Sequence, residues 1–159
     1  MPSLHGSKTS YSVPDSNRYR ILALDYGTKR VGLAVSDEGR MLATARGTIE
    51  NSPKLIQQIV AMTKTENIRT VVLGLPRTLR NTESAMTAIV AKFRSRLKTA
   101  LDPLGVALES WDERLTSIIA GTNIAERGLS KSRRERKGLH DEEAARIILQ
   151  EYLDAHPRA

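Results

Sequence analysis

Residues 20–36 read RILALDYGTKRVGLAVS, which is two short apolar runs separated by a polar turn. The first run, residues 20–25, is apolar up to its last residue, Asp25, and this is typical of a central strand covered on both faces. Residues 26–29 favour a turn, and residues 31–36 favour a second strand that returns antiparallel to the first. The predicted hairpin therefore ends its first strand on a carboxylate.

The chain on the carboxyl side of this hairpin extends the sheet. A turn at 37–40 and a third run at 41–48 complete an antiparallel meander, after which strands alternate with helices. The further elements predicted are a helix after Pro53, a strand at 69–75, a helix from Thr82, a strand at 105–111, a short helix at 116–126 and a last helix at 140–153. Together they predict an α/β domain, a mixed five-stranded sheet flanked by helices, in a layout that resembles a ribonuclease H-like domain.

The first nineteen residues differ in composition from the rest. Residues 1–19 are rich in Ser and carry scarcely any aliphatic side chain, so they bury too little surface to order themselves. We therefore expect a disordered N-terminal tail at 1–19 and a single domain at 20–159, which is long enough for one hydrophobic core.

Composition and charge narrow the possible function. The 159 residues are 40% hydrophobic and include no Cys, which excludes disulfides, thiolate metal sites and thiol nucleophiles. No stretch approaches the roughly 18 apolar residues of a membrane span, and no secretory signal pattern opens the chain, so we expect a soluble, cytoplasmic protein. The net charge of +7 favours a polyanionic partner, and we expect nucleic acid rather than a membrane surface.

Acidic residues stand where the predicted strands end and the last helix begins. Asp25 ends the first strand, Asp112 and Glu113 end the fifth, and each could instead cap a turn or a helix. Asp141 falls on a helical stripe with residues 145, 148 and 152, which are Ala, Ile and Tyr, so it is predicted to face the sheet near Asp25. Carboxylates without Cys or clustered His suit Mg²⁺ or Mn²⁺, and two such ions about 4 Å apart would promote phosphodiester hydrolysis by water.

Basic residues cluster beside these acids. The segment at 127–137 precedes Asp141 and would hold a phosphate backbone next to the metal site, although a charge run is also typical of a solvated loop. The basic side chains on the helix after Thr82 are interpreted as a solvated face and His140 as a helix cap or a surface residue. Trp111 is interpreted as a core residue rather than a base-stacking one. The predicted nucleic-acid-binding residues are Lys29, Arg30, Arg77, Arg80, Arg114, Lys131, Arg133, Arg134, Arg136 and Lys137.

Four ordered motifs within residues 20–154 resemble the YqgF family, Holliday junction resolvase-like proteins described as pre-16S ribosomal RNA nucleases. The motifs are LDYGTKRVG with AVSD at 24–37, GLP at 74–76, DERLT at 112–116 and KGLHD followed by AA at 137–145. The resemblance implies a ribonuclease H-like fold, a metal-dependent nuclease, and maturation of the 5′ end of small-subunit ribosomal RNA. It marks Asp25, Glu113 and Asp141 as catalytic metal ligands, with Asp112 as an additional candidate.

The chain departs from the family pattern at two places. Residues 77–82 replace the usual sequence after GLP, and Glu142 and Glu143 replace an Asp-Ser pair, which could add a metal-facing carboxylate. The expected partners are structured RNA, above all precursor rRNA, or branched DNA, with the ribosome or its assembly intermediates as a possible context.

Three other functions compete with the RNA nuclease. These are a branched-DNA resolvase, a non-catalytic RNA-binding module of the ribosome, and a nucleotide-phosphate enzyme of the actin and sugar-kinase type. The last needs two such domains, and this chain supplies one.

Overall fold

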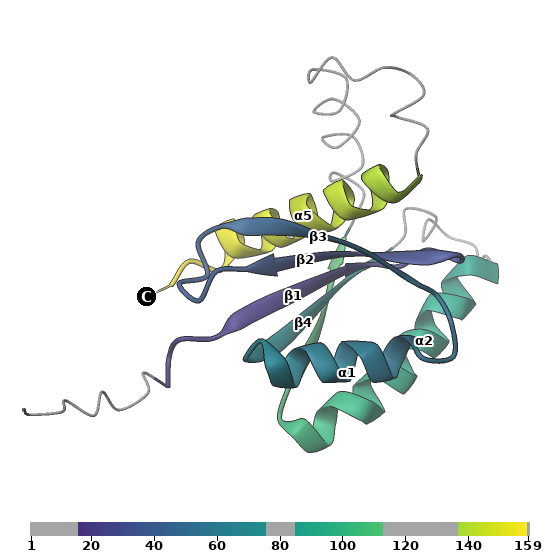
Figure 1. Cartoon of the computed structure of the whole chain (residues 1–159), viewed down its shortest axis with the longest axis horizontal. Coiled ribbons are helices and arrows are strands. Elements are labelled where there is room, and N and C mark those ends of the chain that lie inside the picture. Colours follow the sequence, from purple (N-terminus) through teal and green to yellow (C-terminus); the bar gives the residue numbers. More distant parts are fainter. Residues whose placement is uncertain (1–15, 76–84, 113–136, 159) are drawn as a thin grey trace, which may run out of the picture.

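The computed structural model describes residues 16–75, 85–112 and 137–158, and it describes no side chains at 85–87, 112 and 137–141. Five strands form one sheet that lies between α1 and α2 on one face and α5 on the other (Figure 1). The elements are β1 (Arg20–Asp25), β2 (Arg30–Ser36), β3 (Ala43–Glu50), α1 (Leu55–Thr65), β4 (Ile68–Leu75), α2 (Ala85–Leu101), the 3₁₀ turn η2 (Asp102–Leu104), β5 (Ala107–Asp112) and α5 (Lys137–Ala155).

The sheet has the order β3-β2-β1-β4-β5. β1, β2 and β3 pair antiparallel, whereas β4 and β5 join β1 as parallel strands. This confirms the predicted meander with two added parallel strands. The predicted helix at 116–126 lies outside the described residues.

β3 begins two residues later than predicted because the preceding turn is longer. The Asp37 carboxylate accepts N–H bonds from Gly39, Met41 and Leu42 at 2.8–3.0 Å, which holds residues 37–42 in a turn. Met41 and Leu42 are consequently 72% and 68% exposed instead of pairing in the sheet.

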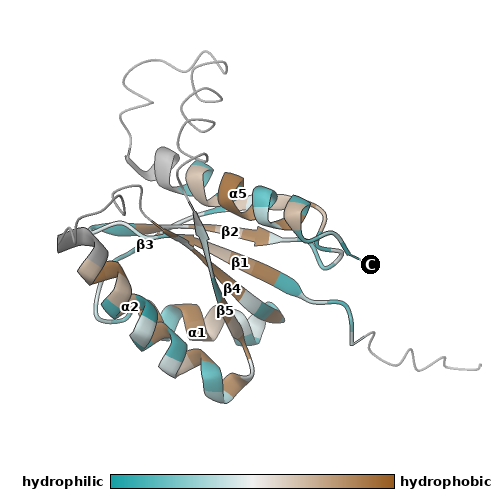
Figure 2. Ribbon diagram, turned by 180° about the vertical axis from the view of Figure 1, so that it is seen from behind, coloured by the Kyte–Doolittle hydropathy of each residue, from teal (hydrophilic) through white to brown (hydrophobic). Residues whose placement is uncertain are grey.

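The side chains of β1 alternate between two cores. Leu22 and Leu24 pack with α1 and α2, whereas Ile21 and Ala23 pack with α5. Figure 2 shows hydrophobic residues along this central strand, as expected of a strand covered on both faces. On the α5 side, Ala23 meets two further fully buried alanines, Ala34 of β2 and Ala145 of α5, and such small side chains let a helix approach a sheet closely.

The predicted stripe of α2 is confirmed at three of its described positions. Val90, Phe93 and Leu97 are buried, but Ile89 is 45% exposed because it borders a surface pocket instead of the core.

Among the helices that the structure describes, none combines the length and the apolar character that a membrane-spanning helix requires.

The segment before β1 is anchored where the structure describes it. The Arg40 guanidinium lies 4.0 Å from the ring centre of Tyr19 and donates a 2.7 Å hydrogen bond to the Asn17 carbonyl. Arg69 donates a 2.9 Å bond to the Ser16 carbonyl. The backbone of residues 16–19 and the Tyr19 ring thus contact Arg40, in the turn between β2 and β3, and Arg69 of β4. Residues 1–15 of the predicted tail lie outside the described residues.

We expect Asp37→Ala to lower the free energy of unfolding by about 1 kcal/mol, because three backbone N–H groups lose their acceptor. Burial raises the pKa of the Asp37 carboxyl, but the N–H groups of Leu42, Met41 and Gly39 outweigh it and hold this pKa below its usual value. The stabilisation is thus present above the unfolded pKa of about 3.9 and is lost as pH falls through the lower folded pKa. Thermal unfolding of the wild type and the variant at pH 7 and pH 3 measures both effects. Glu38→Ala is the control, and an equal loss of stability in both variants would contradict the role of Asp37.

Candidate active site

Asp25 is half-buried at the carboxyl end of β1, which lies between the antiparallel strand β2 and the parallel strand β4. The alternation set by Ile21 and Ala23 places Asp25 on the α5 face. Its partner on β2 is Gly32, and the register of β1 with β4 brings Gly74 to its other side. Glycines flanking a carboxylate leave space over the sheet for a ligand to approach it.

The turn after Asp25 is fixed by the end of β3. A Cβ atom on Gly27 would overlap the backbone carbonyl oxygen of Arg30, so this position requires glycine. The Asn51 side-chain amide donates a 2.8 Å bond to the Gly27 carbonyl, and the Asn51 backbone N–H donates a 2.9 Å bond to the Lys29 carbonyl. These contacts fix the turn after Asp25, in which Lys29 is exposed, and the start of β2, where Arg30 is half-buried.

A side chain of α5 fixes the position of this helix along the sheet. Gln150 accepts the backbone N–H of Ala43 at 3.0 Å. Ala43 is paired with Ser36 of β2, whose hydroxyl accepts the backbone N–H of Ile21 at 2.9 Å. Gln150 therefore lies level with the amino end of β1.

The start of α5 consequently lies at the other end of β1. Asp141 precedes Gln150 by nine residues, or about 13 Å of helix. The four steps from Ile21 to Asp25 span about 13 Å of strand, and α5 runs antiparallel to β1 (Figure 1). The two lengths match, so the backbone of Asp141 lies toward the end of the sheet that carries Asp25.

Of the four predicted metal ligands, Asp25, Asp112, Glu113 and Asp141, only Asp25 has a described side chain. Asp112 is the last residue of β5 and pairs with Leu75, Asp141 belongs to α5, and Glu113 lies outside the described residues. The three apolar positions of the predicted stripe, residues 145, 148 and 152, are buried against the sheet. Within the described part of the chain no three acidic or His side chains gather, so the metal triad stays a prediction.

The predicted basic residues lie largely outside the described part. Lys29 and Arg30 follow Asp25, and Lys137 is the first residue of α5, with its side chain not described. The remaining predicted contacts lie outside the described residues: Arg77, Arg80, Arg114, Lys131, Arg133, Arg134 and Arg136.

Trp111 is a packing residue, as interpreted from the sequence. Its ring meets Tyr152 edge-on with centroids 5.7 Å apart, and its indole N–H donates a 3.2 Å bond to Glu151. The Tyr152 hydroxyl donates a 2.7 Å bond to Glu109, and burial together with this bond raises the pKa of Tyr152 above its usual value. These contacts tie α5 to β5 and leave Trp111 partly buried.

Glu143, considered above as a further metal ligand, is engaged within α5. It is 5% exposed, and its two carboxylate oxygens accept bonds from the Arg146 guanidinium at 2.9 and 3.2 Å. The hydrogen bond to Glu143 raises the pKa of Arg146 against the opposing effect of burial. The structure thus gives this buried carboxylate a guanidinium partner within its own helix, and a role as metal ligand stays a prediction.

We expect Arg146→Met to lower the free energy of unfolding by about 2 kcal/mol, because it removes the guanidinium that binds both oxygens of a buried carboxylate. Chemical denaturation measures the loss. Lys98→Met is the control, since it breaks a 3.0 Å pair with Asp102 between two exposed side chains, where about 0.5 kcal/mol is expected. Similar losses of stability in both variants would show that the buried pair stabilises the fold no more than the exposed pair does.

Comparison with known proteins identifies the family. The sequence model described as RuvX, Holliday junction resolvase, matches residues 19–155. The chain belongs to the RuvX family. This is the YqgF family that the four motifs resemble.

RuvX relatives align over nearly the whole chain. A protein of Chlorobaculum tepidum is 36% identical over 141 residues, covering 89% of this chain and 97% of that protein. One of Crocosphaera subtropica is 40% identical over 139 residues, covering 86% and 94%. Both carry the provisional name pre-16S rRNA nuclease.

Solved structures confirm the ribonuclease H-like fold expected of a RuvX protein. Thermus thermophilus RuvC bound to a Holliday junction superposes with a TM-score of 0.55 at 16% identity, covering 87% of this chain and 95% of that one. The fowlpox virus resolvase bound to Holliday junction DNA gives 0.53 at 12% identity, covering 87% and 99%. Identities this low establish the fold alone.

Proposed function

We propose that this RuvX protein is a metal-dependent nuclease that hydrolyses phosphodiester bonds at the 5′ end of precursor 16S rRNA, in the cytoplasm. The observation that carries the proposal is Asp25, a half-buried carboxylate between Gly32 and Gly74, on the face where α5 begins. The relatives' name favours RNA as the substrate.

The donor chemistry fits a hard divalent cation. Asp25, Glu113 and Asp141 would hold Mg²⁺ or Mn²⁺ through carboxylate oxygens, with Asp112 as a further candidate. When bound, the ions would supply the charge that stabilises the attacking and leaving oxygens at phosphorus. We prefer Glu113 to Asp112 because the resemblance to the YqgF family marks Asp25, Glu113 and Asp141 as the acidic triad.

Basic residues would hold the substrate. Lys29 and Arg30 lie four and five residues after Asp25, at the other end of the turn that follows it, so they would bind the phosphates that flank the reacting one, with Lys137 and the other predicted cations along the backbone. Phosphate contacts do not distinguish RNA from DNA. Branched DNA is the second candidate, favoured by the description of the matching family as a Holliday junction resolvase.

The test is cleavage of a short precursor-rRNA mimic and of a four-way DNA junction, each with Mg²⁺, Mn²⁺ or a chelator. We expect cleavage of the RNA with either metal and none with chelator. Preferred cleavage of the junction would assign the second candidate. Tight binding without cleavage under all conditions would overturn the nuclease and favour the RNA-binding module.

A further inference from the structure

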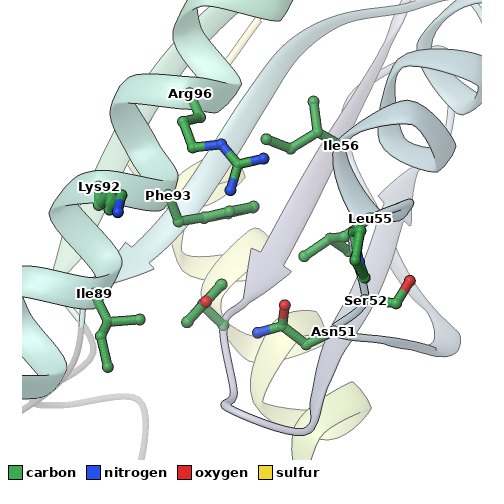
Figure 3. Close-up of a pocket in the computed structure, with 10 residues that line it drawn as sticks. Asn51, Ser52, Leu55, Ile56, Ile89, Lys92, Phe93 and Arg96 are labelled. Atoms are coloured by element: carbon green, nitrogen blue, oxygen red, sulfur yellow. The ribbon is translucent and has the colours of Figure 1, made fainter.

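A pocket of about 200 Å³ opens on the α1/α2 face of the sheet, at the carboxyl end of β1 (Figure 3). One wall comes from α2, with Ile89, Lys92, Phe93 and Arg96, and the opposite wall comes from residues 51–53 and the first turn of α1. Tyr26, the residue after Asp25, also lines the pocket. The pocket thus lies beside the candidate active site but on the other face of the sheet.

The interior of the pocket is aromatic and aliphatic. Tyr26 packs against Phe93 with ring centroids 4.6 Å apart, and Phe93 is buried behind it. Tyr26 and Ile56 are half-buried, and Ile89 is 45% exposed although it belongs to the apolar stripe of α2. These three side chains offer apolar surface to a flat ring.

Lys92 and Arg96 line the pocket, and they differ from the two other cations of α2 in having no hydrogen-bond or ion-pair partner among the described residues. Arg94 donates a 3.0 Å bond to Ser110, and Lys98 pairs with Asp102. Among the described residues no carboxylate pairs with Lys92 or Arg96, and both line the pocket one helical turn apart. Like charges at this spacing destabilise a helix, and an anion bound between them would relieve the repulsion.

We infer that this pocket binds one nucleotide unit, with its unstacked base against Tyr26, Ile56 and Ile89 and its phosphate between Lys92 and Arg96. The volume is below the roughly 300 Å³ of the smallest drug-sized pockets, which suits one ring system. Aromatic and apolar surfaces bind bases of any sequence, and adjacent cations bind the backbone.

The source of the nucleotide is a strand held for cleavage, so the inference rests on the proposed function. Asp25 and Tyr26 are consecutive at the carboxyl end of β1, so the candidate active site and the pocket meet at the same end of the sheet, on its two faces. A strand bound at Asp25 that passes over this end of the sheet would place a nucleotide next to the reacting one at the pocket. A free mononucleotide has the same chemistry and is distinguished below.

The first test compares two double variants of equal charge on the same helix. We expect Lys92→Ala/Arg96→Ala to weaken binding of a 12-nucleotide RNA in chelator about tenfold, and to reduce the slope of log K against log salt by about 0.7, the value of one phosphate on a single strand. Arg94→Ala/Lys98→Ala should weaken binding no more than about twofold. Equal effects in the two double variants would overturn the site, because they would reflect only the net charge. Circular dichroism confirms that both variants are folded.

The second test concerns the base. We expect the wild type to prefer the natural RNA about tenfold over an abasic strand of the same length, and Ile89→Ser to reduce this preference. Ala91→Ser, an exposed position on the same helix outside the pocket, should retain it. A wild type without preference for the natural strand would overturn the base-binding part.

Adenosine 5′-monophosphate distinguishes the two sources. If it shifts the Tyr26 and Phe93 NMR signals in the wild type but not in Lys92→Ala/Arg96→Ala, while RNA affinity is equal in both proteins, the ligand is a free nucleotide and the strand assignment is overturned.

The cleavage assay distinguishes a failure of the proposed pocket from a failure of the proposed nuclease activity. Metal-dependent cleavage with unchanged RNA binding in the pocket variants overturns the pocket alone, and pocket-dependent binding without any cleavage overturns the nuclease alone.

Discussion

Asp25→Asn should lower the rate of metal-dependent cleavage at least about 100-fold, because an amide replaces a negatively charged oxygen donor at the proposed metal site. The change is isosteric, and Asp25 is half-buried at the end of a strand, so the fold and the affinity for RNA should be retained. Single-turnover cleavage of the precursor-rRNA mimic, with RNA binding measured in chelator, gives both quantities.

The matched control is Asp37→Asn. Asp37 also follows a strand, but its carboxylate accepts three backbone N–H groups in the turn at 37–42. This variant should cleave at the wild-type rate and lose some stability instead. Cleavage by Asp25→Asn at the wild-type rate would contradict the proposed site. An equal loss of cleavage in both variants would show that the effect comes from the change in net charge and not from the position of Asp25.

The three inner strands of the sheet, β1, β2 and β4, were predictable because they are apolar runs of strand length. β1 is bounded by its own sequence, since the run ends at Asp25 and a glycine turn follows. β3 was predicted two residues too early, because Met41 and Leu42 are apolar yet belong to the turn that Asp37 holds by side-chain bonds. Apolar character alone does not distinguish a strand from a turn stabilised by one carboxylate.

The position of Asp25 at the end of a buried strand could be predicted from the sequence, whereas the contacts of the acidic residues around it could not. A carboxylate that ends a buried strand is visible in the sequence, and so is the stripe that links Asp141 to Ala145. Glu143 is equally acidic in the sequence, but only packing shows that Arg146 binds both of its oxygens.

The pocket on the α1/α2 face could not be predicted, because its walls come from three separate parts of the chain. The four cations of α2 look alike in the sequence and were interpreted together as a solvated face. The structure separates them, since Arg94 and Lys98 have partners of their own whereas Lys92 and Arg96 line the pocket.

Ala145→Leu should lower the free energy of unfolding by about 3 kcal/mol and the midpoint of thermal unfolding by about 10 °C. Ala145 is fully buried where α5 meets Ala23 and Ala34, which are also fully buried, and the added carbons of Leu have no space there. The contact can accommodate them only by moving α5 away from the sheet.

The same displacement should impair catalysis. Ala145 lies one turn after Asp141, so moving this part of α5 moves the backbone of the proposed ligand relative to Asp25, and a shift of about 1 Å can lower a rate about 100-fold. Cleavage measured well below the unfolding temperature of the variant separates this effect from unfolding. If Ala145→Leu does not fold, Ala145→Val makes the same test with a smaller side chain.

Ala144→Leu is the control for both effects, because it adds the same atoms at the neighbouring, partly exposed position. It should change stability by less than about 1 kcal/mol and leave cleavage near the wild-type rate. If Ala145→Leu loses stability but cleaves as fast as Ala144→Leu, the close approach of α5 serves the core alone, and Asp141 does not depend on it for its position at the site.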